Sequence, residues 1–220
     1  NNIIQINMKG LPKQKKMNQY DNLSSQSVMS YLEEKNYSKC VEVCQQGFGI
    51  TKSTHEKPFI STFGMSSCIG IVGYSFKYKI AFILHLDNPK MIHDKNMGSI
   101  YYKIKQAIKN NHDGIEFDVQ LFGGFQMYRQ EFVDYIYSQF NKYNYFYKNA
   151  DCSVKINIIK NNIGTDLNSS NICIDTNNGN LYKFDGRNTQ FSQNELKINE
   201  MRIIINAHSS EPDLIINHIC

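Results

Sequence analysis

The stretch "STFGMSSCIGIVGYSFKYKIAFILHL", residues 61–86, contains the pattern that decides the fold of this chain. Within it, residues 68–74 and 79–86 are rich in β-branched and aromatic side chains and are bounded by Gly, Ser or Lys, as strands usually are. A segment of the same kind, residues 57–63, comes just before them. We therefore expect neighbouring β-strands, with a cysteine at the start of one and a histidine at the end of another.

The two later segments predict an antiparallel hairpin, since few residues separate them. If its turn is centred between Phe76 and Lys77, Cys68 lies directly opposite His85. Opposed residues share a face of the sheet, with their Cβ atoms about 4.5–5.5 Å apart. A slip of one residue would move His85 to the other face. The register therefore predicts that a thiol and an imidazole meet on one face.

Two roles remain open for this pair. Free cysteine is a common buried residue, and a histidine in an apolar strand is usually a satisfied core residue. As a nucleophile and its base, the two would instead do chemistry, because a neighbouring imidazolium lowers the pKa of a thiol. Gly64, Ser66 and Ser67 let the backbone before Cys68 pack closely. Backbone amides from Ser66 to Cys68 would then form an oxyanion hole.

The rest of the chain predicts a domain that mixes helices with strands. An extension at 1–46 with one helix at 23–46 precedes a catalytic domain at 47–220, and whether Cys40 to Cys44 belong to that helix or to a first strand is open. This order favours an α+β fold, a mixed sheet or β-sandwich with flanking helices. Further helices are expected at 97–111 and 127–143, and further strands at 114–124, 153–159, 171–175, 180–184 and 201–206, with a hairpin turn at 176–180.

Composition excludes several classes of function. The balance of 24 basic and 20 acidic residues is too mild to indicate a nucleic-acid partner. No run of 18 apolar residues exists to insert into a membrane. The six cysteines include no CxxC pair, so we expect free thiols and no metal, although a zinc site could be imagined from Cys40, Cys44, His208, His218 and Cys220. No secretory leader is visible, and we expect a cytoplasmic protein.

The opening stretch, extended to Pro89, resembles the chemoreceptor glutamine deamidases of bacterial chemotaxis, the CheD family. That family carries a T-x-G-x-x-S-C motif, followed by a hydrophobic strand and then a histidine. The matching residues here are Thr62, Gly64, Ser67 and Cys68, and then His85. The spacings from threonine to cysteine and from cysteine to histidine are both similar to those of the family.

Two further blocks are similar to the same family. "FDVQLFGGFQM" (117–127) resembles its strand ending in F-G-G-x-x-M, and "ICIDTNNGNLYKFD" (172–185) resembles its closing hairpin. The resemblance covers roughly residues 40 to 185. The chain departs from the family at Ser66, where the usual residue is glycine, and at 78–80, where a Gly-Gly pair is usual.

The resemblance implies a CheD-like deamidase fold and a Cys–His–Thr site. Toxin deamidases of the cytotoxic necrotizing factor and Burkholderia lethal factor type share this fold and site, and they modify a glutamine on a host protein. By this resemblance Cys68 is the nucleophile, His85 is the general base, and Thr62 orients the histidine. No cofactor is implied, and the partner is a protein that presents a glutamine.

We therefore expect a protein-glutamine deamidase that works through a cysteine thioester. The extra termini favour a toxin- or effector-like enzyme, delivered into a host cell, over a chemotaxis enzyme acting on chemoreceptors. A Cys–His protease, or a binding module without turnover, would also be compatible with the same fold.

Overall fold

The structure is a computed structural model that describes residues 29–108, 114–124, 130–148, 153–164, 171–184 and 193–220. It has an α+β architecture with two β-sheets, as the sequence predicts. Most of the N-terminal extension and Met127 of the F-G-G-x-x-M block lie outside the described residues.

The larger sheet has six strands in the order β10-β2-β5-β4-β6-β7. Antiparallel pairing joins β2 to β5, β5 to β4 and β4 to β6, whereas the two edge strands pair in parallel. The strands are β2 (Gly47–Lys52), β4 (Ile69–Ser75), β5 (Ile80–Leu86), β6 (Ile115–Gly123), β7 (Val154–Asn161) and β10 (Ile215–Ile219).

The smaller sheet has four strands in the order β1-β3-β8-β9 and stacks on one face of the larger sheet. Its strands are β1 (Cys40–Val43), β3 (Phe59–Thr62), β8 (Ile172–Asp175) and β9 (Leu181–Lys183). The turn predicted at 176–180 does connect an antiparallel pair, β8 and β9, with Gly179 at a positive φ of 79°.

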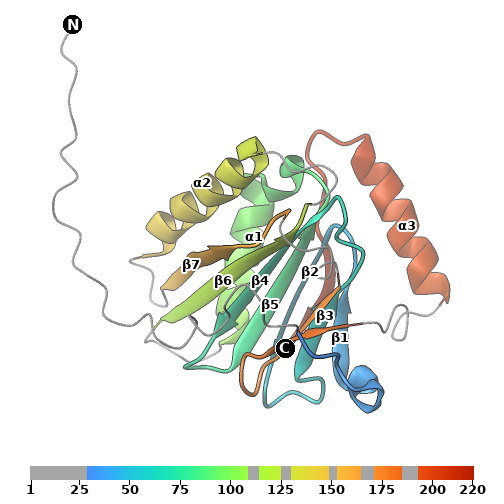
Figure 1. Cartoon of the computed structure of the whole chain (residues 1–220). Coiled ribbons are helices and arrows are strands. Elements are labelled where there is room, and N and C mark those ends of the chain that lie inside the picture. Colours follow the sequence, from blue (N-terminus) through green and yellow to red (C-terminus); the bar gives the residue numbers. More distant parts are fainter. Residues whose placement is uncertain (1–28, 109–113, 125–129, 149–152, 165–170, 185–192) are drawn as a thin grey trace, which may run out of the picture.

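Helices α1 (Asp94–Ala107) and α2 (Gln130–Tyr147) cover the other face of the six-stranded sheet, and α3 (Gln193–Ala207) stands apart from them (Figure 1). Two short 3₁₀ helices, η1 (Glu34–Lys39) and η2 (Pro89–Ile92), connect other elements. The order of layers is therefore helices, large sheet and small sheet.

Strands β4 and β5 are buried along their whole length because both of their faces are covered. Successive side chains of a strand point to opposite faces. Ile71 and Leu84 accordingly join the apolar core under the helices. Val72 and Ile83, one residue away on each strand, join the core between the two sheets. A site on the second face is enclosed by both sheets.

For residues 40–44 the sequence leaves helix and strand open, and Cys40–Val43 form β1, which pairs with β3. In the described part of the helix expected over 23–46, only the 3₁₀ helix η1 forms, so an α-helix there is wrong. The strand expected at 201–206 is part of α3, whose Met201, Ile204 and Ile205 are exposed, so a run of β-branched residues there reflects no sheet.

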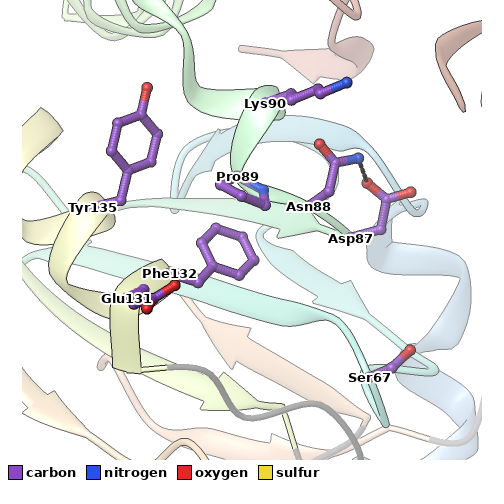
Figure 2. A pocket seen from close by; sticks show the side chains of 8 residues that line it. All are labelled: Ser67, Asp87, Asn88, Pro89, Lys90, Glu131, Phe132 and Tyr135. Atoms are coloured by element: carbon purple, nitrogen blue, oxygen red, sulfur yellow. Dashed lines mark hydrogen bonds between the residues drawn. The ribbon is translucent and has the colours of Figure 1, made fainter. Parts of the chain in front are cut away.

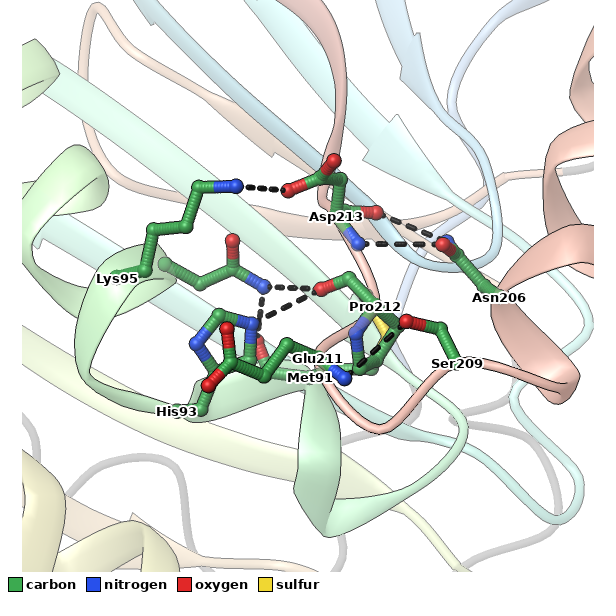
Figure 3. Close-up of polar contacts among 9 residues, drawn as sticks. Met91, His93, Lys95, Asn206, Ser209, Glu211, Pro212 and Asp213 are labelled. Atoms are coloured by element: carbon green, nitrogen blue, oxygen red, sulfur yellow. Dashed lines mark hydrogen bonds and ion pairs between the residues drawn. The ribbon is translucent and has the colours of Figure 1, made fainter.

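The segment after α3 is attached to the start of α1 (Figure 3). The carbonyl oxygen of Pro212 lies 2.8 Å from Asn96 Nδ2, which donates to it, and 3.1 Å from His93 Nε2. Lys95 forms an ion pair with Asp213 at 3.0 Å. These contacts fix the path of the chain into β10, which the sequence patterns did not predict.

Candidate active site

The two sheets are joined at the site by a hydrogen bond between Thr62 and His85. Thr62 ends β3 in the smaller sheet, and His85 lies near the end of β5 in the larger one. Thr62 Oγ1 is 2.7 Å from His85 Nδ1, and both residues are buried. The structure thus brings together two of the three residues that the sequence predicted to act together.

A second bond from Thr62 decides which nitrogen of His85 carries the proton. Thr62 Oγ1 donates to the carbonyl oxygen of Val43 at 2.8 Å, which uses its only proton. Thr62 must therefore accept a hydrogen bond from His85 Nδ1–H. In a neutral imidazole this leaves the lone pair on Nε2. The arrangement selects the tautomer in which Nε2 is the basic atom.

His85 is held in its neutral form with Nε2 unused. Burial lowers the pKa of His85 to about 4, although the Asp87 carboxylate acts in the opposite direction. Nε2 is buried and makes no hydrogen bond within the described part of the chain. A buried acceptor without a partner is costly, and such atoms often mark function. The imidazole therefore presents a free lone pair to the space between the sheets.

The predicted register of the hairpin is wrong by two residues. Gly70, not Cys68, lies opposite His85, and one pair further on Ile69 lies opposite Leu86. The turn has four residues rather than two, because Lys79 and not Phe76 or Lys77 takes the positive φ of 50° that closes it. A shift of two residues preserves the face, so Cys68 still lies on the side of the sheet that carries His85.

Cys68 is a buried thiol, without the lowered pKa that a neighbouring imidazolium would give it. Burial and, after it, the charge of Asp87 raise the pKa of Cys68, a hydrogen bond with the Ser67 side chain lowers it, and the resulting pKa is about 11. The residue is 5% exposed. No hydrogen bond to His85 is formed, since Nε2 has no partner among the described residues. The resting pair is therefore neutral, and the thiol and the imidazole lie on one face without a hydrogen bond between them.

The backbone of the cysteine loop rests directly on the two glycines of the F-G-G block. The amide of Gly124 donates to the carbonyl oxygens of Cys68, at 2.9 Å, and Met65, at 3.3 Å. A Cβ atom on Gly123 would lie 2.3 Å from the carbonyl oxygen of Cys68, and its φ is +86°. Only glycine fits there without strain. The second sequence block thus supports the loop that carries the cysteine.

Ser66 and Ser67, the predicted oxyanion residues, form the turn before Cys68 and are half-buried. The loop is further secured where Asn171 Oδ1 accepts a hydrogen bond from the Gly64 amide at 2.8 Å. Among the described residues, the backbone N–H groups of Ser66, Ser67 and Cys68 donate to no backbone carbonyl. Backbone amides without a backbone partner are the kind of donor that an oxyanion hole uses.

A pocket of about 430 Å³ opens beside Ser67, the residue before Cys68 (Figure 2). Ser67, Asp87 and Asn88 lie at one end of it, whereas Phe132 and Tyr135 of α2 lie at the other. Pro89, Lys90 and Glu131 complete the lining. The pocket therefore has a polar end at Ser67 and Asp87 and an aromatic end formed by α2, and neither Cys68 nor His85 is among its lining residues.

Asp87 is the site residue that the sequence patterns missed. Continued by one pair beyond Ile69 and Leu86, the observed register places Asp87 opposite Cys68. Its Oδ2 accepts hydrogen bonds from Gln45 Nε2, at 3.0 Å, and from Gln46 Nε2. Asp87 becomes the partner of the cysteine only because the turn has four residues, a length that the sequence does not indicate.

The C-terminal part of the chain also reaches the site. Asn206, at the end of α3, donates from Nδ2 to Gln46 Oε1 at 2.7 Å, and Gln46 in turn donates to Asp87. Asn206 is itself held by the backbone of Asp213. This part of the chain lies beyond residue 185, outside the range of the resemblance.

Within the described ranges, no three of the His, Cys, Asp and Glu side chains gather as a metal site requires. Nor does any helix in that part of the chain have the length and apolar character needed to cross a membrane. Comparison of the chain with protein-family models and with curated proteins gives no match.

Proposed function

We propose that this chain is a protein-glutamine deamidase, in which Cys68 attacks the side-chain carboxamide of a glutamine on a substrate protein. The observation that carries the proposal is the set of bonds around Thr62. They leave the proton of His85 on Nδ1 and a free lone pair on Nε2, on the face of the sheet that also carries Cys68. This is the arrangement that a general base for a thiol needs.

The first half of the reaction forms a thioester. His85 Nε2 takes the proton of the Cys68 thiol as Sγ bonds to the carboxamide carbon, because the neutral resting pair holds no preformed thiolate. Backbone amides from Ser66 to Cys68 hold the oxyanion. The imidazolium then returns its proton to the nitrogen, the C–N bond breaks, and ammonia leaves.

The second half releases glutamate. A water molecule gives a proton to His85 Nε2 as its oxygen bonds to the thioester carbon. The C–S bond breaks, and the proton returns to Sγ of Cys68. The net change is glutamine plus water to glutamate plus ammonia. Thr62 acts throughout as a positioning residue, since it keeps the Nδ1 proton in place.

Three sequence blocks support the proposal, because they are similar to the CheD family and to toxin deamidases of the same fold. The structure gives physical reasons for two of the resembling motifs. Thr62 binds His85, and Gly123 and Gly124 carry the cysteine loop. We propose a toxin- or effector-like enzyme acting on a host protein in the host cytoplasm, with chemoreceptors as the alternative substrate.

The test is intact mass spectrometry of candidate substrates, which gain about one dalton when a carboxamide becomes a carboxylate. Wild-type protein and Cys68→Ala would each be incubated with chemoreceptor cytoplasmic domains and with proteins of a eukaryotic extract. Cys220→Ala, which removes a half-buried cysteine that follows β10, is the matched control. We expect the mass gain with wild type and Cys220→Ala alone. Deamidation by Cys68→Ala, or peptide cleavage in its place, would contradict the proposal.

A further inference from the structure

We propose that Asp87 selects primary carboxamides at the polar end of the pocket, by accepting their N–H groups and by repelling carboxylates. The proposal rests on the proposed function, since it assigns a specificity-determining residue to the same site. The group that Asp87 selects is the glutamine side chain of the substrate, in preference to the glutamate side chain of the product. The following contacts carry it.

Asp87 already binds primary carboxamides in this structure. The three hydrogen bonds described for its carboxylate come from Gln45 Nε2, Gln46 Nε2 and Asn88 Nδ2, each of which is a side-chain amide. An ionised carboxylate offers about four acceptor positions. Two of these bonds reach Oδ2, and only that of Asn88, at 2.7 Å, reaches Oδ1. Oδ1 therefore has room for one more donor.

A second acceptor lies beside it. Asn88 Oδ1 is buried and makes no hydrogen bond within the described part of the chain, and both Asp87 and Asn88 line the pocket (Figure 2). A primary carboxamide carries two N–H donors on one nitrogen. One donor would reach Asp87 Oδ1 and the other Asn88 Oδ1. The unpaired oxygen of Asn88 is thus explained by a ligand that brings a pair of donors.

The charge of Asp87 gives the discrimination. Among the described residues no lysine, arginine or histidine forms an ion pair with it, although Lys90 lines the same pocket. A glutamate carboxylate in the same place would face a like charge and would bring no donor. The register places Asp87 opposite Cys68, so the selected group lies next to the nucleophile. The same repulsion favours release of the product.

Alkylation of Cys68 tests the selection without any need for a known substrate. Iodoacetamide carries a primary carboxamide, N,N-dimethyl-iodoacetamide carries an amide without N–H, and iodoacetate carries a carboxylate. Each reagent would be applied to the full chain, and the rate at Cys68 would be followed by peptide mass spectrometry. Each rate is divided by that of N-acetylcysteine in the same solution, which removes the intrinsic reactivity of the reagent.

In the wild-type protein we expect iodoacetamide to be favoured over iodoacetate by about tenfold or more, as a like charge a few ångströms away requires. It should be favoured over the dimethyl reagent by a few-fold, the size of a hydrogen-bond effect. In Asp87→Asn, the normalised rates with iodoacetamide and with iodoacetate should become nearly equal. Asp94→Asn, which removes an exposed carboxylate paired with Lys142, should leave it unchanged.

Three results would overturn the proposal. The first is an unchanged ratio of the iodoacetamide rate to the iodoacetate rate in Asp87→Asn, and the second is an equal loss of selectivity in Asp94→Asn. The third is a Cys68 that none of the reagents reaches in the folded protein, because the ligand must meet the thiol and the carboxylate together. Selectivity for iodoacetamide in a protein that deamidates nothing would refute the proposed function alone. The proposal would then stand as a carboxamide-binding site.

Discussion

On β4 and β5, Ile71, Phe82 and Leu84 point to the helices, whereas Val72, Ile83 and His85 point to the smaller sheet. Both faces are buried, and both are built from the same two strands. The helix-covered face is held together by apolar packing. The face between the sheets also contains Thr62 and His85, whose polar atoms are bonded across the layer. Burial alone therefore does not distinguish a core from a site; on these two strands the unpaired buried Nε2 of His85 does.

The largest effect is expected on the helix-covered face. Phe82 is fully buried and contacts the rings of Phe48 and Phe117, so Phe82→Ala should lower the free energy of unfolding by about 3–5 kcal/mol. The rate of Cys68 alkylation by iodoacetamide, measured in protein that remains folded, should change little. Urea unfolding and the alkylation rate check the two parts. A change in the Cys68 alkylation rate larger than the change in the free energy of unfolding, with both expressed as free energies, would contradict the distinction between the two faces.

On the face between the sheets, His85 should make stability depend on acid. Its pKa is lowered from 6.5 to about 4 by burial, so between these values the unfolded chain binds a proton that the folded chain does not. Stability must therefore fall as pH falls through this window, by up to about 3 kcal/mol.

His85→Gln removes this acid dependence. The difference in unfolding free energy between the variant and wild type should shift in favour of the variant by about 2–3 kcal/mol between pH 7 and pH 4.5. Urea titrations at the two pH values measure the shift. Parallel pH profiles for the two proteins would show that His85 is not held neutral in the folded state.

Thr62→Val tests the hydroxyl that joins the two sheets. The variant keeps the shape of the side chain but leaves His85 Nδ1–H and the carbonyl oxygen of Val43 without their partner, which should cost about 1–3 kcal/mol. The rate of deamidation should fall by more than the loss of unfolding free energy explains, because the imidazole loses its fixed tautomer. Thr62→Ser keeps the hydroxyl and should restore most of the activity. Equal activity of the two variants would remove the positioning role.

A loss of stability is also expected where the cysteine loop meets β6. Gly123→Ala forces a side chain into a backbone with φ +86°, which alone costs about 1–2 kcal/mol, and it places Cβ 2.3 Å from the carbonyl oxygen of Cys68, so that the clash adds to this cost. The loop must move, so the alkylation rate of Cys68 should change severalfold. Gly98→Ala, at a position with ordinary φ where an added Cβ would meet only Tyr143 Cε1 at 4.0 Å, is the control for stability and rate. An unaltered rate in Gly123→Ala would contradict the support role of this glycine.

Much of the sandwich can be predicted from the sequence because its central strands follow simple patterns. The segments at 57–63, 68–74 and 79–86 are rich in β-branched and aromatic residues, and they form β3, β4 and β5. The pattern predicts a strand where α3 lies because local preference for β-branched residues, as in "RIII" at 202–205, does not decide an element's type. Strand β10 is not predicted because only Ile215 is buried, so its apolar alternation is weak.

The site can be predicted only in part. The spacing of Thr62, Cys68 and His85 identifies residues that share one region of the sandwich. The length of the turn at 76–79 cannot be deduced, since no residue in it favours a positive φ strongly, and so the register and the position of Asp87 do not follow from the sequence. The pKa of Cys68 depends on burial between two sheets and on a charge that only the correct register brings near. Spacing alone does not carry that information.

The most direct test of the mechanism is the protonation state of His85, read by ¹⁵N NMR of the imidazole in the resting protein near pH 7. We predict a neutral ring with the proton on Nδ1 and a lone pair on Nε2, as the bonds from Thr62 require. The same tautomer should persist in Cys68→Ala and be lost in Thr62→Val. A proton on Nε2, or a charged imidazolium, in the resting wild-type protein would contradict the role of His85 as the base for Cys68.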